Sequence, residues 1–175
     1  MIGKKERTED VYVTGGPRRY FRIMYSGIYD IDTILANISK WLSRRKYAPI
    51  VSEHTEGVTS AGLNVRMIMI PFRNVNEYIR FFIEIEIDIL RGVDVLVEEN
   101  GRQIKKQKGD IEIRTRSFMR KNYRMTFKGR GKEFFRRTYE AYVIKQELDN
   151  YEAKLRDETK ELLDFIGEVL QKFRR

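Results

Sequence analysis

The hydrophobic and polar positions of this chain follow two different periods. From Asp30 onward the apolar residues recur at intervals of three and four, which predicts an amphipathic helix. The apolar stripe of that helix consists of Ile31, Ile34, Leu35, Ile38, Trp41 and Leu42. Residues 19–26 and 80–90 instead alternate in the manner of a strand, and the second segment does so strictly. Residues 80–90 therefore predict a strand with one buried and one solvated face.

Further strands are expected in the middle of the chain, where turn signals separate short apolar runs. Asn100-Gly101 is the clearest hairpin signal, because a type I′ turn needs positive φ at both central residues. Lys108-Gly109 marks a second turn. The candidate strands are residues 50–56, 63–70, 93–99, 102–106, 111–118 and 123–127. The pattern therefore predicts an antiparallel meander.

The C-terminal segment from Lys132 carries apolar residues at helical spacing and contains no proline. Four of them recur every seven residues, as in the seam of a coiled coil: Leu148, Leu155, Leu162 and Val169. A continuous helix over this segment would span about 65 Å, whereas a compact chain of this length has a radius of gyration of about 16 Å. We therefore expect the helix to break near Asp149-Asn150 or to project. Our interpretation is a peripheral helix that contacts a partner helix, and packing inside the monomer is the alternative.

These elements predict an α+β fold, in which an antiparallel sheet meander is combined with one N-terminal amphipathic helix and a long C-terminal helix. At 175 residues, the chain is long enough for one core and one appended element. We divide it into a charged N-terminal arm (1–18), an α+β domain (19–147) and a C-terminal helix extension (148–175). The order of elements resembles that of helix-grip (START-like) proteins at the level of topology. Proteins of that fold often enclose apolar ligands, so a ligand-binding domain is one functional class to consider.

The positive charge of the chain is concentrated in one segment. Residues 102–137 contain fourteen Lys or Arg and three acids, a surplus of +11. The net charge of the whole chain is +9, so the other residues together carry about −2. A local surplus of this size attracts phosphate polymers or acidic partners. The cations that we predict to bind nucleic acid are Arg102, Lys105, Lys106, Lys108, Arg120, Lys121, Arg124, Lys128, Arg130, Lys132, Arg136 and Arg137.

Aromatic residues are interleaved with the cations in the second part of this segment: Phe118, Tyr123, Phe127, Phe134 and Phe135. Such a mixture suits a nucleic-acid surface, because phosphates take the charge and rings stack on unpaired bases. In the alternative interpretation, the rings belong to the core and the arginines neutralise acidic elements. Three acids on the strand at 80–90 do not offset eleven surplus cations, which favours the binding interpretation.

The acids of that strand, Glu84, Glu86 and Asp88, are expected on one face at spacings of about 7 Å. With Mg²⁺ or Mn²⁺ they would suit a nuclease. The interpretation that we favour is cross-strand pairing with Arg114 and Arg116, which contributes about 0.2 to 1 kcal/mol per pair. We therefore expect no metal site, no cofactor and no catalytic residue.

Other classes of site lack their residues. The chain has no cysteine, which excludes disulfides, thiolate zinc sites and cysteine nucleophiles and fits a cytoplasmic location. The single histidine, His54, has no partner at a suggestive spacing and is expected to be exposed. Residues 128–132 lack the glycine and hydroxyl positions of a phosphate-binding loop. No run of about 18 apolar residues exists, so we expect neither a membrane span nor a signal peptide.

The sequence thus predicts a non-enzymatic module that docks a basic surface on RNA or a ribonucleoprotein, mainly through phosphate contacts. The alternative is a structural subunit of a self- or hetero-assembly. In that case the C-terminal helix joins the subunits, a homo-oligomer is expected, and the basic face meets an acidic protein surface. A ligand-binding helix-grip domain ranks third and a metal-dependent nuclease last.

Overall fold

The structure, a computed structural model, describes residues 9–14, 20–48, 51–124 and 132–174. It is a mixed α+β fold built on a large antiparallel sheet of seven strands. The strands are β1 (Glu9–Tyr12), β2 (Phe21–Tyr29), β3 (Val51–Thr59), β4 (Gly62–Met69), β5 (Phe72–Asn74), β6 (Ile79–Glu99) and β7 (Arg102–Lys121). The helices are α1 (Ile31–Arg44), α2 (Lys132–Thr138), a π-helical turn (Tyr139–Val143) and α3 (Lys145–Lys172).

Two long strands, β6 and β7, form the centre of the sheet. The order is β1-β7-β6-β4-β3, with β2 also paired to β7 and β5 also paired to β6. The hairpin between the long strands turns at Asn100 and Gly101, whose φ angles are 52° and 73°. This confirms the hairpin that the sequence predicts and accounts for the antiparallel pairing of β6 with β7. The other strand pairs of the sheet are antiparallel as well.

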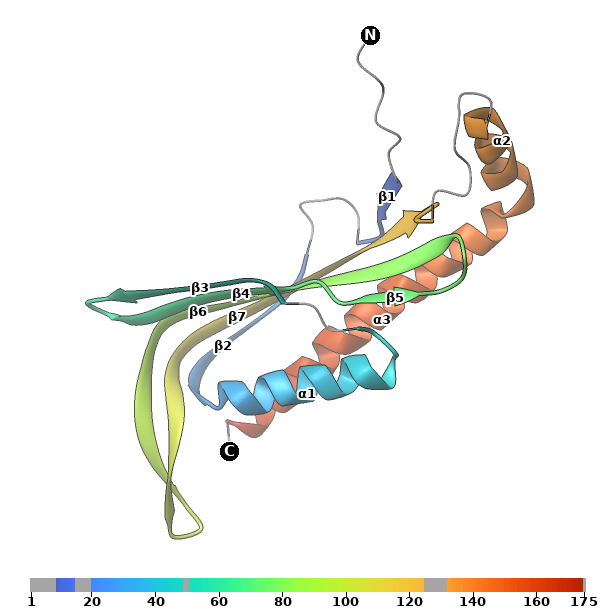
Figure 1. Ribbon diagram of the computed structural model, residues 1–175. Coiled ribbons are helices and arrows are strands. Elements are labelled where there is room, and N and C mark those ends of the chain that lie inside the picture. The colour runs from blue at the N-terminus through green and yellow to red at the C-terminus, as the bar shows by residue number, and fades with distance from the viewer. Residues whose placement is uncertain (1–8, 15–19, 49–50, 125–131, 175) are drawn as a thin grey trace.

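A β-bulge bends the central hairpin. The register between β6 and β7 shifts between Leu90 and Val93, and Arg91 between them has a φ of 57°. Across the bulge, a Cβ atom on Gly109 would lie 3.0 Å from the carbonyl oxygen of Leu90, so the close approach of the backbone favours glycine at this position. Beyond the bulge, residues 93–108 continue as a ribbon that bends toward the side of the sheet on which the helices lie (Figure 1). Residues 107 and 108 of this ribbon also pair with β2. The sequence predicts separate strands on either side of this point, but the structure joins them.

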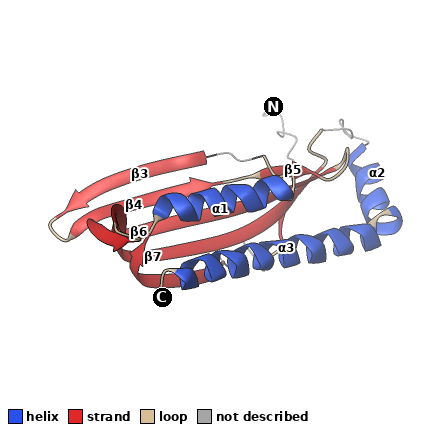
Figure 2. Cartoon of the chain, turned by 90° about the horizontal axis from the view of Figure 1, so that it is seen from below, coloured by secondary structure: helices blue, strands red, loops and turns tan. Residues whose placement is uncertain are grey.

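Both long helices lie on one face of the sheet, and no helix of the described residues lies over the opposite face of the central strands (Figures 1 and 2). The side chains of β6 that point to the helices are apolar and almost fully buried, for example Ile83, Ile85 and Ile87. α1 is the helix predicted from Asp30. The Asp30 side chain caps it by accepting the backbone N–H groups of Asp32 and Thr33, which satisfies two otherwise unpaired donors.

α3 lies along the sheet beside α1 and does not project from the molecule (Figure 2). Its 28 residues span about 42 Å. The π-helical turn ends at Val143, and the next residue, Ile144, has a non-helical φ of −119°, so α3 begins at Lys145. The interruption therefore lies before the position expected at Asp149-Asn150.

The four residues assigned to a partner helix lie in the core of the chain itself. Leu148, Leu155, Leu162 and Val169 are 8%, 0%, 0% and 5% exposed. Seven-residue spacing places side chains on one helix face, and here that face packs on the sheet. This corrects the partner-helix assignment, because these side chains are not available to another molecule.

A buried polar network connects α3 to α1 and β5. Glu158 is 4% exposed and accepts two hydrogen bonds from the Nη2 atom of Arg73 and one from the Tyr47 hydroxyl group, at 2.8 to 3.0 Å. The Nη1 atom of Arg73 donates to the carbonyl oxygen of Arg45. Burial, followed by the charge of Glu158, raises the pKa of Tyr47. The buried charges of Arg73 and Glu158 are thus hydrogen-bonded to each other and to neighbouring groups on the helix-covered side.

Part of the expected N-terminal arm belongs to the sheet. β1 pairs with the end of β7, where Glu9 lies opposite Lys121 and Tyr12 opposite Phe118. Residues 1–8 lie outside the described residues. The strand expected at 123–127 is not seen where it is described, since Tyr123 and Arg124 form a turn and 125–127 lie outside the described residues.

Candidate nucleic-acid interface

The predicted basic segment is divided between the two ends of the sheet. Arg102, Lys105, Lys106 and Lys108 lie on the ribbon, and the cations from Arg120 onward lie at the opposite end, beside β1 and α2. Residues 106 and 120 of β7 are about 45 Å apart along the strand at 3.3 Å per residue. Lys128 and Arg130 lie outside the described residues, and so does the side chain of Lys132. The described cations therefore do not form one patch.

Many of these cations are paired with acids that come from outside the segment. The pairs are Lys105–Asp94, Lys106–Glu99, Arg114–Asp88, Arg116–Glu84, Arg120–Asp10, Lys121–Glu140, Arg124–Glu77 and Arg136–Glu140. The sequence argument compared the surplus cations with only the three acids of the strand at 80–90, so it underestimated how much of the positive charge is neutralised. Among the described residues, Arg102 and Lys108 of the ribbon form no ion pair.

Glu140, in the π-helical turn, receives several of these contacts. It accepts hydrogen bonds from Lys121 at 2.8 Å, from Arg136 at 3.0 Å and from the Tyr78 hydroxyl group. Burial opposes ionisation, but the hydrogen bonds from Lys121 and Tyr78 hold the pKa of Glu140 below its usual value. Lys121 and Arg136 thus fasten the α2 region to the sheet, which is a structural use of two predicted binding residues.

The acidic strand face is paired as expected from the sequence. Glu86 contacts Arg66 and lies 3.0 Å from Arg114, and Arg116 donates to Glu84 at 2.7 Å. These contacts confirm the cross-strand pairing. No group of three or more His, Cys, Asp or Glu residues is placed to hold a metal ion in the described part of the chain. His54 is exposed on β3, as predicted, and its Nε2 atom lies 2.7 Å from Glu56.

An aromatic row crosses the helix-free face at the end of the sheet where β1 and β5 lie. The row comprises Tyr12, Phe118, Phe82 and Phe72, which come from β1, β7, β6 and β5 in turn. Successive ring centroids are 5.4, 4.7 and 6.1 Å apart. Cross-strand register explains this arrangement, because Phe118 lies opposite both Tyr12 and Phe82, and Phe82 lies opposite Phe72.

Arginines lie over the rings of the aromatic row. The guanidinium carbon of Arg80 is 4.7 Å from the Phe72 centroid and 4.3 Å from that of Tyr123, so Arg80 lies against both rings. The guanidinium carbon of Arg120 is 4.8 Å from the Phe82 centroid. Arg80 and Arg120 are held by Asn74 and Asp10, respectively. The result is a layered surface of planar groups, which is chemically suited to stacking on nucleic-acid bases.

Much of the net positive charge of the sequence belongs to three segments that lie outside the described residues. Residues 1–8, 15–19 and 125–131 carry six of the nine net charges in their sequences. Their described neighbours all lie near residues 115–121 of β7. Glu9 pairs with Lys121, Tyr12 and Phe21 pair with Phe118 and Thr115, and Arg124 follows the end of β7. The chain therefore connects most of its net charge to this end of the sheet.

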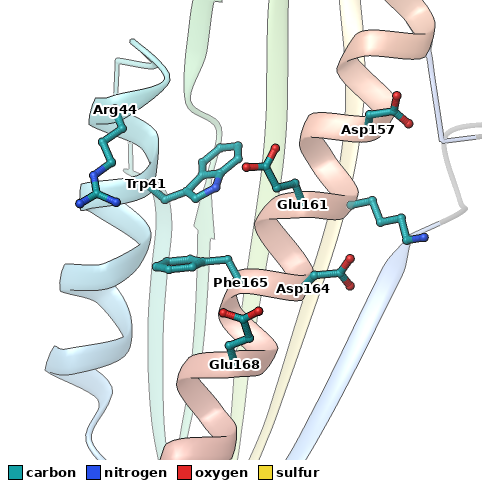
Figure 3. A pocket seen from close by; sticks show the side chains of 8 residues that line it. Trp41, Arg44, Asp157, Glu161, Asp164, Phe165 and Glu168 are labelled. Atoms are coloured by element: carbon teal, nitrogen blue, oxygen red, sulfur yellow. The ribbon is translucent and has the colours of Figure 1, made fainter.

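The helix side of the molecule carries an excess of negative charge on α3. α3 contains eight acids and five bases. A groove of about 520 Å³ lies between α1 and α3, where Trp41 and Phe165 point toward each other (Figure 3). Its lining carries four carboxylates and two cations: Asp157, Glu161, Asp164 and Glu168 against Arg44 and Lys160. A polyanion is therefore disfavoured on the helix side.

Comparison with known proteins yields no relative. No family model matches the chain, and neither a curated protein nor a solved structure matches it. In the described ranges, no helix is both long and apolar enough to cross a membrane.

Sequence analysis found only part of the aromatic row. Of its four rings only Phe118, which is 8% exposed, was among the predicted ones. Tyr123 was also predicted, and it lies beside the row against Arg80. Phe134 is exposed at 71% on α2, away from the row, while Phe127 and the side chain of Phe135 lie outside the described residues. Tyr12, Phe72, Phe82 and Arg80 were missed, because they come from segments far apart in the chain. One feature of the sequence could have indicated the row: Phe82 shares the strand face of Glu84 and Glu86, so the alternation places an aromatic ring on the otherwise acidic face.

Proposed function

We propose that the protein is a non-enzymatic module that binds single-stranded RNA on the helix-free face of its sheet, over the aromatic row. The observation that supports this most is the coincidence of two features at one end of the sheet. The first is the layer of rings and guanidinium groups, and the second is the attachment there of segments that carry most of the net charge.

The arrangement favours single strands because an unpaired base exposes the face that stacks on a ring or guanidinium group. Ion pairing of Arg120 with Asp10 and of Arg124 with Glu77 lowers the local charge without removing it, since Arg80 is held by a neutral amide. We expect phosphates to supply most of the affinity and base identity to have little effect. The helix-grip topology and the cytoplasmic location belong to the same proposal.

The test measures fluorescence anisotropy of a labelled single-stranded RNA at several salt concentrations. The site variant replaces Arg80 and Arg124 with alanine, and the matched control replaces Lys105 and Lys108 on the ribbon. Both remove two cations. Each lost phosphate contact lowers the slope of log K against log salt by about 0.7, so we expect a slope change of about 1.4 in the site variant and little change in the control.

A second variant separates stacking from charge. Phe72→Ala leaves the net charge unchanged, and loss of one stacked base weakens binding by about 1 to 3 kcal/mol, with the salt slope preserved. Equal losses in the site and control variants would show that only total charge matters. A larger loss in the ribbon variant would place the site at the other end of β7. Either result contradicts the proposal.

A further inference from the structure

A cavity of about 300 Å³ opens on the helix-covered face of the sheet, at the end opposite to the aromatic row. It lies between α1 and the side chains of β3, β4 and β6, and the proposed RNA surface does not include it. Val65, Met67 and Ile89 form its strand side, since Val65 lies opposite Ile89 in the register. Ile31 and Leu35 form its helix side.

The orientation of α1 explains why the cavity is left open. Ile34 and Ile38 are buried at 0% and 1% exposure and turn toward the core. Ile31 and Leu35, one turn apart, share a neighbouring side of the helix and are only half-buried. The helix therefore seals the core on one side and leaves an apolar wall on the other.

Two bulges shape the end of the cavity. The pairing of β4 with β6 shifts between Leu63 and Val65, and β6 shifts against β7 between Leu90 and Val93. Gly92 lies at this point, where a Cβ atom would approach Ile89 to 3.1 Å and the carbonyl oxygen of Leu63 to 3.3 Å. Bulges are often found beside binding sites because they redirect side chains.

The charged groups around the cavity are acidic. Asp32, Glu56 and Asp94 line it together with His54, and no Lys or Arg is present among the described residues that line it. His54 is in contact with Glu56, and Asp94 is paired at 2.8 Å with Lys105, which lies outside the lining. The apolar interior thus opens at a rim that favours a positive charge.

From this combination we infer that the cavity binds a small molecule with an apolar body and a single ammonium group. The body replaces water against Val65, Met67 and Leu35, and the ammonium group lies at the acidic rim. At about 30 Å³ for each water-sized group, the cavity accommodates about ten non-hydrogen atoms. A linear or cyclic aliphatic amine of that size fits these requirements.

The test compares three probes of similar length on the full chain by isothermal titration calorimetry: nonylamine, nonan-1-ol and octanoate. We expect nonylamine to bind with one-to-one stoichiometry and about tenfold more tightly than the alcohol, which corresponds to about 1.4 kcal/mol. Octanoate should not bind measurably. Nonan-1-ol tests binding to the apolar interior alone, and octanoate tests whether the rim repels a negative charge.

Two variants locate the site. Leu35→Trp fills the cavity and should abolish binding of all three probes, and Met67→Phe fills it from the sheet side if the first variant does not melt cooperatively. Glu56→Gln should reduce the preference for amine over alcohol and leave the alcohol affinity unchanged. Glu161→Gln removes the same charge in the groove between α1 and α3, and it should change neither affinity.

Three results would overturn the inference: no binding of nonylamine, binding of octanoate as strong as that of the amine, or amine binding that survives both filling variants. RNA binding is measured in parallel on Leu35→Trp. Because the aromatic row lies on the other face, RNA affinity should be unchanged, so failure of one proposal is distinguishable from failure of the other.

Discussion

The two faces of the central strands are formed by alternate residues of the same segments, yet different forces stabilise them. On the helix-covered face, β6 contributes Ile83, Ile85 and Ile87, which are buried against the helices. On the helix-free face, the intervening Glu84 and Glu86 are also buried, at 8% and 2% exposure, although no helix in the described part of the chain covers them (Figure 2).

Arginine side chains account for this difference. Arg66, Arg114 and Arg116 lie across Glu84 and Glu86 and shield them from water while hydrogen-bonding to them. Arginine suits this role because its planar group pairs with carboxylates and stacks on rings. A sheet face can therefore be closed by paired charges as well as by apolar packing, but we expect the two solutions to differ in energy.

The largest expected effect is the loss of α3 from the covered face. Truncation after Glu147 removes the buried Leu155, Leu162 and Ile166 and exposes the core of the sheet. We expect the truncated chain to lose its cooperative unfolding transition, measured by circular dichroism during thermal and urea denaturation. A truncated chain that still melts cooperatively would show that the covered face does not need the helix, as the sequence pattern had suggested.

The second largest effect is expected in the buried network on the covered side, where the Glu158 carboxylate accepts hydrogen bonds from Arg73 and Tyr47. Glu158→Ala leaves the Arg73 charge without its buried partner, which typically costs about 3 to 5 kcal/mol. Urea unfolding measures this change. Glu161→Ala, one turn away in a pair of half-exposed side chains, should cost less than about 1 kcal/mol.

A smaller effect is expected from the corresponding change on the helix-free face. Glu86→Gln removes the charge between Arg66 and Arg114 but keeps the shape, and we expect a loss of about 2 kcal/mol in the free energy of unfolding. Arg22→Ala is the control, because its pair with Glu112 is long, at 3.7 Å, and exposed. A loss for Glu86→Gln as small as that of the control would mean that the ladder closes the face without stabilising it.

The smallest expected effect is an increase in the free energy of unfolding. The Tyr29 hydroxyl group is buried on the covered side and has no hydrogen-bond partner in the described part of the chain. Tyr29→Phe removes this unsatisfied group, so we expect stabilisation by about 1 kcal/mol at pH 7.

Alkaline pH tests the same tyrosine further. Burial, followed by the charge of the nearby Asp110, raises the pKa of Tyr29 to about 12, compared with about 10 for an ordinary tyrosine. A raised folded-state pKa means that this contribution to stability is complete below pH 10 and is lost between about pH 10 and pH 12. The decline in stability over that range should be shallower in Tyr29→Phe. Identical pH profiles would place the hydroxyl group in contact with water.

Local patterns allowed the sequence to predict much of the fold. The helix from Asp30, the alternation at 80–90 and the turn at Asn100-Gly101 each depend on residues close together in the chain, and the structure contains all three. The pairing of Glu84 with Arg116 was also predictable, because opposite charges on alternating strands share a face.

The rest depends on contacts between distant segments. The short strand β1 gains its structure by pairing with β7, more than one hundred residues later. The aromatic row requires four strands to come into register. The spacing of Leu155 and Leu162 indicates that they share a helix face, but it does not indicate whether that face meets the chain's own sheet or another molecule.

The bulge at Leu90 and Val93 divides each central strand into two parts with different protection. Before it, β6 lies between neighbours on both sides, whereas residues 95–106 pair only with each other. An isolated two-stranded ribbon has marginal stability in water. Amide hydrogens of the ribbon should therefore exchange with solvent through local opening, while those of residues 81–89 exchange only when the whole domain unfolds. A single continuous strand thus contains both the most persistent and some of the most readily opened hydrogen bonds of the sheet.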